Sequence, residues 1–223
     1  MNEEILQEFW YNFSDEQRNI ILTNCFEDYD KFLQGKKCNV EKIKQHFPHN
    51  HLKFLNCISE GNLERVKMYV KLGAQKEAKN DAAFRYAALY GYLDIVKYFI
   101  KLGADIHAVN DEALRNVANH GRLRILKYLV KLGADIHEFD DWPIRMAAGN
   151  GHLDVVKYLV KQGADIHAEN DRALRNAAQG GHLSVVKYLV KQGANVHAGS
   201  DLALMWAIES NRTEVVEYLK SLS

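Results

Sequence analysis

Four histidines that recur every thirty residues are the first candidates for chemistry: His107, His137, His167 and His197. Histidine is a common metal ligand, so the series could mark a chain of metal sites. Copies of one residue in stacked repeats lie about 10 Å apart, the spacing of packed helices. Zinc needs its ligands about 2 Å away, so no two of these histidines can share an ion. We expect them instead to hydrogen-bond the neighbouring repeat.

A second histidine cluster lies nearer the N-terminus, in the run HFPHNH. His46, His49 and His51 are close in sequence to Cys38 and Cys57, and these side chains together could hold a zinc ion. The alternative is a group of surface histidines without a metal. Because the spacing fits no common zinc pattern, we predict no metal site and no cofactor.

Arginines and aspartates form two further series with the same period. Each aspartate precedes an arginine by four residues, which would place both side chains on one face of a helix. One interpretation is a lattice of Asp–Arg contacts within and between repeats; the other is an arginine stripe that binds anions. Because every arginine brings its own carboxylate, we predict the lattice. The pairs are Asp81 and Arg85, Asp111 and Arg115, Asp141 and Arg145, and Asp171 and Arg175.

No recognised catalytic arrangement accompanies these series. The sequence has no GxSxG nucleophile motif, no phosphate-binding loop and no cysteine–histidine pair that a repeat array would bring together. We therefore predict that the protein is not an enzyme.

Glycines mark the elements that must position these side chains. A common sequence motif begins with glycine every thirty residues; the copy that starts at Gly151 is GHLDVVKYLVKQGAD. Its apolar residues recur at spacings of three and four, which predicts an amphipathic helix. A shorter helix precedes each copy of this motif, with an aspartate of the series at its N-cap. Each repeat therefore consists of a helix, a glycine turn, a second helix and an extended GADIHA segment, and such repeats must stack to bury their apolar faces.

The stretch AAGNGHLDVVKYLVKQGAD at 147–165 resembles the ankyrin repeat. The resemblance covers residues 51–223, as repeats 51–80, 81–110, 111–140, 141–170, 171–200 and 201–223, and it implies an all-α solenoid. An ankyrin unit has about 33 residues, and here three are missing before the first helix, so we expect short, blunt fingers between repeats. Thirty-residue repeats with this sequence are similar to those of ankyrin proteins from giant DNA viruses of amoebae.

The two ends of an array need covers for their apolar faces. At the C-terminus, Glu217, Lys220 and Ser221 predict a polar cap. Residues 1–50 have helical patterning and include a degenerate half repeat at 38–47, so we predict that they form an N-terminal helical cap. The alternative is a recruiting module, because EEILQEFWYNF faintly resembles the start of an F-box, which would couple the array to ubiquitin machinery.

Positions that differ between repeats are the candidates for recognition, since the scaffold is otherwise constant. In ankyrin proteins the fingers and first helices line a concave surface that binds partners. Carried over to this chain, that arrangement implies a partner-binding surface with an apolar patch at its middle, at Phe139, Trp142 and Met146. The predicted residues are Tyr86, Leu89, Tyr90, Val109, Glu112, Asn116, Phe139, Trp142, Met146, Glu169, Arg172, Asn176 and Trp206.

Composition narrows the kind of partner. The chain of 223 residues has 29 Lys and Arg and 29 Asp and Glu, and its formal net charge is zero. Two lysine series on the second helices, Lys67 to Lys187 and Lys71 to Lys191, are typical of a solvated face, and a nucleic-acid or membrane role is the alternative. We predict an intracellular, cytoplasmic monomer (in the host cytoplasm, if viral) that binds a protein, with no nucleic acid and no membrane. A virion or oligomeric scaffold is a further alternative.

Overall fold

The computed structural model describes residues 51–71 and 82–222 of the chain. The predicted N-terminal cap, its half repeat at 38–47 and most of the HFPHNH cluster lie outside these residues. The chain divides into two compact units, residues 1–86 and 87–223, which are described separately.

In the first unit, α5 (His51–Ser59) and α6 (Leu63–Lys71) form a helical pair. The turn between them passes through Gly61, whose φ of 74° is the left-handed conformation that glycine adopts without a Cβ penalty. Phe54, Ile58 and Val66 are fully buried between the two helices. The α7 helix (Ala82–Tyr90) lies at the boundary of the units.

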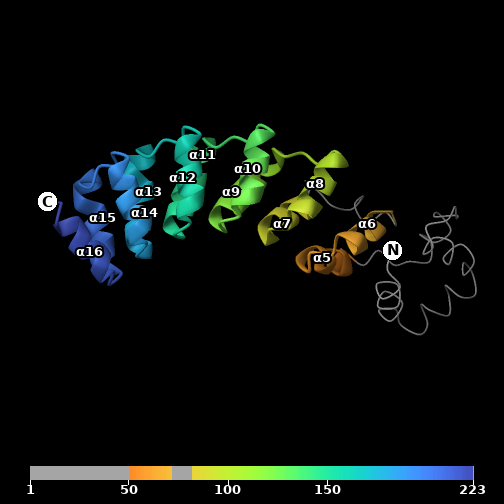
Figure 1. Cartoon of the computed structure of the whole chain (residues 1–223), viewed down its shortest axis with the longest axis horizontal. Helices are drawn as coiled ribbons and strands as arrows, with labels where there is room; N and C mark the ends of the chain where they lie inside the picture. The colour runs from red at the N-terminus through yellow and green to blue at the C-terminus, as the bar shows by residue number, and fades with distance from the viewer. Residues whose placement is uncertain (1–50, 72–81, 223) are drawn as a thin grey trace, which may run out of the picture. The chain divides into compact units, whose positions relative to one another are not determined.

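The second unit continues the pattern with a second helix, α8, and then four further pairs (Figure 1). We call the helix that opens a repeat the first helix and its partner the second helix. The first helices are α9 (Ala108–Asn119), α11 (Glu138–Gly149), α13 (Ala168–Gly180) and α15 (Ala198–Glu209). The second helices are α8 (Leu93–Lys101), α10 (Leu123–Lys131), α12 (Leu153–Lys161), α14 (Leu183–Lys191) and α16 (Thr213–Lys220).

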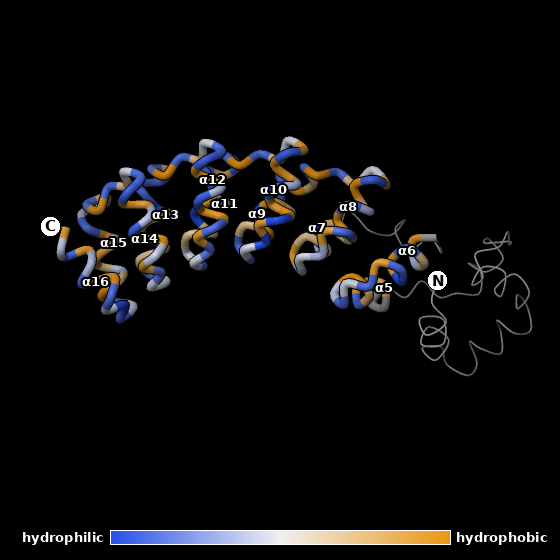
Figure 2. The backbone as a smooth tube through the Cα atoms, viewed as in Figure 1, coloured by the Kyte–Doolittle hydropathy of each residue, from blue (hydrophilic) through white to orange (hydrophobic). Residues whose placement is uncertain are grey.

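Two layers of helices result within this unit. Neighbouring first helices contact each other extensively, whereas neighbouring second helices touch at only a few places. Small residues allow the close approach: a Cβ added at Gly149 would lie 3.2 Å from the Cβ of Asn176. The core lies between the layers, where alanines of the first helices meet Val155, Val156 and Leu159 of α12 and their equivalents (Figure 2). The all-α repeat solenoid predicted from the sequence is confirmed for the described residues.

The glycine that follows α9, α11 and α13 leaves space for a side chain of the next repeat. Gly121 has a φ of 66°, and a Cβ on it would lie 2.6 Å from Nδ1 of His152. That histidine reaches back with its other ring nitrogen, Nε2, to the carbonyl oxygen of Asn119 at 3.0 Å. Arg212 makes the same backward contact, donating from Nε to the carbonyl of Gln179 at 2.9 Å. The recurring glycine therefore leaves room for a side chain that joins two repeats.

The sequence GADIHA suggested an extended segment between repeats, but the structure has turns there. The Oδ1 atom of Asp105 accepts a hydrogen bond from the main-chain N–H of His107 at 2.9 Å, which closes a tight turn. Three consecutive residues then adopt positive φ: Val109 at 55°, Asn110 at 54° and Asp111 at 51°. The same left-handed turn recurs at Phe139–Asp141, Glu169–Asp171 and Gly199–Asp201. The short connection is thus a single turn of left-handed backbone.

The last repeat differs from the internal ones at its outer end. Ile208 is 49% exposed, whereas the equivalent Ala118, Ala148 and Ala178 are fully buried. Met205 is likewise exposed. Glu217, Lys220 and Ser221 are exposed on the same repeat, so the end of the array presents both polar and apolar side chains.

Candidate protein-binding surface

The left-handed turns are held by the arginine series. Non-glycine residues disfavour this conformation by about 1–2 kcal/mol each, because Cβ approaches the following carbonyl. The guanidinium of Arg115 donates from Nη2 to the carbonyl oxygen of Val109 at 3.0 Å. Arg145 makes the same bond to Phe139, and Arg175 makes it to Glu169. Each arginine therefore fixes the first carbonyl of a left-handed turn.

The fourth left-handed turn lacks both a side chain at its first position and the arginine that binds the turn. At Gly199 the first position carries no Cβ, and Met205 replaces the arginine. In the described turns, an arginine is present wherever the first residue has a side chain and is absent where that residue is glycine.

The predicted Asp–Arg lattice is wrong for the pairs that begin at Asp111, Asp141 and Asp171, because these aspartates pair with the histidine series; Asp81 lies outside the described residues. Nδ1 of His137 lies 3.0 Å from Oδ1 of Asp141, and the same pair forms at His107 and Asp111, His167 and Asp171, and His197 and Asp201. The four-residue rule for Asp–Arg pairs assumes that both residues are helical. The aspartates instead occupy the left-handed turn, so their carboxylates face the preceding histidine.

Successive connections are joined by the aspartate, whereas we had expected the histidine four residues before it to make this contact. Oδ1 of Asp141 accepts a second hydrogen bond, at 3.0 Å, from the main-chain N–H of Asp165 in the connection that follows α12. Asp171 accepts the equivalent bond from Asn195 at 2.9 Å. Asp141 and Asp171 are 6% and 4% exposed. Asp141 and Asp171 are therefore internal links of the array and are not available as a site.

The repeat positions that vary have the opposite environment. Every residue of the predicted partner-binding surface is at least partly exposed. The most exposed apolar ones are Tyr86, Tyr90, Val109 and Phe139, at 41–47%. The variable positions are thus exposed, whereas the repeated Asp111, Asp141 and Asp171 are buried.

At the middle of the second unit, two of these residues gather around an arginine. The Cζ atom of Arg115 lies 4.8 Å from the ring centroid of Phe139 and 5.9 Å from that of Trp142. A guanidinium within about 6 Å of an aromatic ring attracts its electron-rich face. Val109, whose carbonyl the same arginine binds, is exposed beside it. We call Arg115, Phe139 and Trp142 the aromatic cluster, and Arg115 is a member that the sequence did not indicate.

Further along, the variable residues are charged and polar. Oε2 of Glu169 bridges Arg145 at 2.9 Å and Arg172 at 3.1 Å. Asn176 donates from Nδ2 to the carbonyl of Arg145 at 3.2 Å. The ring of Trp206 has Arg175 over it at 5.2 Å. Thus Glu169, Asn176 and Trp206 also join neighbouring repeats, and only part of each side chain is accessible.

A different surface lies on the second helices, which carry most of the unit's basic residues. We call it the lysine face. Each lysine of one series lies over the tyrosine ring of the next repeat: Lys97 on Tyr128, Lys127 on Tyr158, Lys157 on Tyr188 and Lys187 on Tyr218, at 5.3–5.8 Å. Only Asp94 and Asp154 are acidic on α8, α10, α12 and α14. The basic residues there are Lys97, Lys101, Arg124, Lys127, Lys131, Lys157, Lys161, Lys187 and Lys191.

The connections between repeats carry the compensating charge. Exposed carboxylates there include Asp105, Asp135, Asp140, Asp165 and Glu169. The zero net charge of the chain therefore conceals a division in the second unit between a basic face and acidic connections. The tyrosine series was missed in the sequence, where a tyrosine beside each lysine at the same phase of every repeat was the available signal.

Two further classes of site are absent from the described residues. Among residues 51–71 and 82–222, no three His, Cys, Asp or Glu side chains come together in a way that would hold a metal ion. Over the same part of the chain, no helix is both long and apolar enough to cross a lipid bilayer.

The helical pairs and the division between buried and variable positions define a repeat solenoid. A family model described as "Ankyrin repeats (3 copies)" matches residues 54–140 and 144–222. The chain belongs to the ankyrin repeat family, whose repeats are non-catalytic protein–protein interaction modules. A search of curated proteins found no match to the chain.

Proposed function

We propose that this protein binds a protein partner through the aromatic cluster and the exposed variable residues beside it. The observation that carries this proposal is the exposure of Phe139, at 47%, on a backbone turn that Arg145 holds in place. Aromatic residues and arginine are enriched among the residues that dominate binding energy at interfaces. Because the turn and its neighbours are already ordered, docking involves little loss of conformational freedom.

The surface would act with other predicted residues of the second unit. Leu89, Tyr90, Glu112, Asn116, Met146 and Arg172 supply further exposed contacts of mixed polarity. A host protein is a candidate partner if the resemblance to viral ankyrin proteins reflects the source of the chain.

The test is quantitative affinity capture from the cells in which the protein is expressed. The double variant Phe139→Ala and Trp142→Ala should lose its captured partner while its far-ultraviolet circular dichroism stays unchanged. Leu132→Ala is the matched control, because this leucine is also exposed, at 42%, but lies at the end of a second helix. Capture that survives in the double variant, or that is lost equally in the control, would exclude the aromatic cluster.

An oligomeric scaffold is the second candidate, favoured by the exposed Met205 and Ile208 on the last repeat. Stacking of this face on a second molecule would bury both side chains. Sedimentation equilibrium of the wild type and of Met205→Gln with Ile208→Gln tests this. A wild-type monomer at all concentrations would eliminate it.

An adaptor role rests only on the sequence of residues 1–50, with their faint F-box resemblance. Comparison of partners captured by the full chain and by residues 51–223 tests it. Loss of ubiquitin-ligase subunits from a truncated but folded array is the result that the adaptor role requires.

A further inference from the structure

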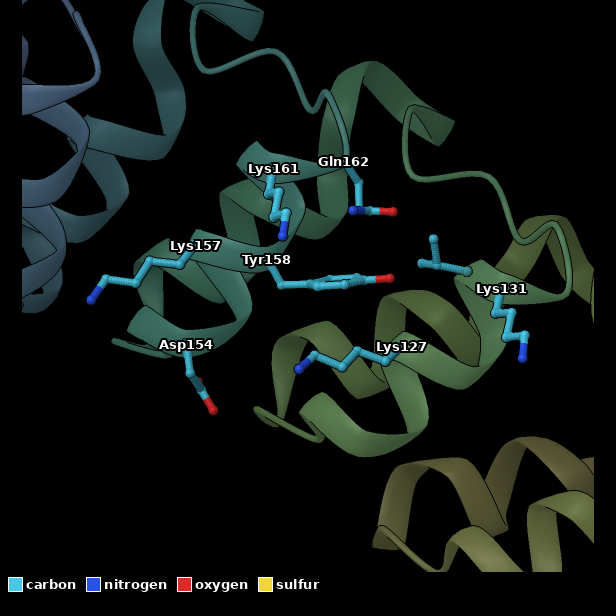
Figure 3. Close-up of a pocket in the computed structure, with 8 residues that line it drawn as sticks. Lys127, Lys131, Asp154, Lys157, Tyr158, Lys161 and Gln162 are labelled. Atoms are coloured by element: carbon cyan, nitrogen blue, oxygen red, sulfur yellow. The ribbon is translucent and has the colours of Figure 1, made fainter.

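The lysine face is a second exposed surface of the unit, separate from the aromatic cluster. Between α10 and α12 it contains an open groove with a volume of about 690 Å³ (Figure 3). Lys127 and Lys131 border the groove on one helix, and Lys157 and Lys161 border it on the next. Such a groove follows from the sparse contact between second helices, which leaves space that side chains of ordinary size do not fill.

Part of this positive charge is fixed in position. Nζ of Lys127 lies 5.5 Å from the centre of the Tyr158 ring, and Lys157 has the same relation to Tyr188 at 5.8 Å. A lysine held on a ring has fewer rotamers to lose when it binds an anion. Lys131 and Lys161, at the ends of their helices, have no such partner in the described residues and remain exposed.

Asp154 adds one carboxylate to the lining, and the remaining residues are uncharged. The ring of Tyr158 forms one wall, and Val130 and Gln162 complete the lining (Figure 3). Burial raises the pKa of Tyr158, so its hydroxyl stays protonated and can donate a hydrogen bond. The groove thus offers apolar surface and hydrogen-bonding groups between four ammonium groups.

This combination distinguishes between classes of anionic partner. Single-stranded nucleic acid needs several aromatic rings on which successive bases stack, but Tyr158 is the one aromatic residue in the lining of this groove, and Lys127 occupies part of its ring. Duplex recognition relies largely on arginine forks, and on these four second helices only Arg124 supplies one. A membrane surface would require a row of apolar side chains to insert, whereas Val130 lies within the groove. A polypeptide with carboxylates and apolar side chains matches the four lysines, Val130 and Tyr158, and Asp154 is the one lining residue that opposes it.

We propose that the lysine face binds an extended acidic segment of a partner protein, with carboxylates at the lysines and an apolar side chain against Val130 and Tyr158. The lysine rows repeat about every 10 Å, the spacing of packed helices. An extended chain rises about 3.3 Å per residue, so every third residue of the segment meets a new row. The same residue types recur between α12 and α14, where Ser184 replaces Asp154 and removes a competing carboxylate.

The test uses the full chain and a fluorescent peptide of repeated Glu-Leu-Ser triplets, with fluorescence anisotropy as the readout. The double variant Lys131→Gln with Lys161→Gln should bind the peptide about fivefold or more weakly, since each exposed ion pair contributes modestly. Both lysines are exposed, and within residues 51–71 and 82–222 neither makes a hydrogen bond, ion pair or ring contact, so the fold should be unaffected. Lys220→Gln, on α16, is the matched control and should bind as the wild type does. Binding should also weaken as salt is raised, because exposed charges are screened.

Four outcomes would overturn the proposal. These are absence of binding by the wild type, equal binding by the lysine double variant, equal binding of a Gln-Leu-Ser peptide, and tighter binding of a DNA duplex or of anionic vesicles than of the acidic peptide. The variant Phe139→Ala with Trp142→Ala should still bind the peptide. A failure of the aromatic cluster in capture and a failure of the lysine face here are therefore separate results.

Discussion

Arg145 and Phe139 are joined by a hydrogen bond from a buried guanidinium to a main-chain carbonyl, at the point where the backbone turns left-handed. The same guanidinium reaches Glu169, in the following left-handed turn, through Nη1 at 2.9 Å. One side chain thus stabilises an unfavourable backbone conformation and links it to the next left-handed turn.

Replacement of Arg145 by alanine should therefore lower the free energy of unfolding by about 1–3 kcal/mol, the usual effect of leaving a buried acceptor without its donor. Urea unfolding followed by circular dichroism measures it. Arg172→Ala is the control, because this arginine is exposed and its pair with Glu169 lies at the surface; we expect a change below about 0.5 kcal/mol. Equal losses in both variants would show that the bond to the turn is unimportant.

A reciprocal exchange at the first position of the turn tests the cost of the left-handed conformation. Val109→Gly should raise stability by about 0.5–1 kcal/mol, because relief of the Cβ clash exceeds the entropy lost by glycine. Gly199→Val should lower it, since no arginine binds that turn and the new Cβ would lie 2.6 Å from Cδ1 of Leu202. Thermal unfolding of both variants distinguishes the directions, and a destabilised Val109→Gly would contradict the argument.

The buried aspartates join successive connections, so the loss of one carboxylate should weaken the connection that follows it. Asp141→Ala removes the acceptor for the N–H of Asp165, so the variant should lose about 1–3 kcal/mol of stability. Hydrogen exchange of the Asp165 amide should accelerate. In Asp201→Ala the lost carboxylate is 52% exposed and bonds only to His197, so a small effect is expected. Unchanged exchange at Asp165 would argue against the link.

One histidine gives the array a defined pH dependence. The hydrogen bond to Asp111, and secondarily the charges of Asp111, Asp105 and Asp135, raise the pKa of His107 above its usual value, while partial desolvation opposes them. A raised pKa means that the protonated form stabilises the folded state. That contribution is complete below the pKa of the unfolded chain and disappears as the pH rises through the pKa of the folded state. Titration by NMR should show the raised value, and Asp111→Asn should lower it; an unshifted His107 would refute the assignment.

The helices were predictable because apolar spacing and glycine positions depend on residues close together in sequence. The connection was not, since left-handed φ values at Val109 and Phe139 run against their local preference and depend on an arginine six residues away. Asn110 and Asp111 tolerate that conformation and were the only hint. The Asp–Arg prediction failed for the same reason, because it treated Asp141 as helical.

The exposed positions could be selected because they vary while the scaffold does not. Their partners within the fold could not be selected in this way. Arg115 belongs to a series that looked purely internal, and its contact with Phe139 and Trp142 requires three-dimensional packing. That these positions bind a partner stays a prediction.

His152 and Arg212 contact the preceding repeat at the same repeat position, and the bond from Asp165 to Asp141 recurs as that from Asn195 to Asp171. The contacts that join the array therefore use the same pair of repeat positions each time. If residues 141–170 were removed and Asp140 were joined to Asp171, the new junction would offer the same carboxylate, the same glycine and a side chain of the same kind to reach back. A gene that gains or loses ninety bases in frame can therefore change the copy number of its repeats without redesigning any junction. Recombination between near-identical units would then alter which exposed residues are adjacent, and the inherited unit of change would be a whole repeat.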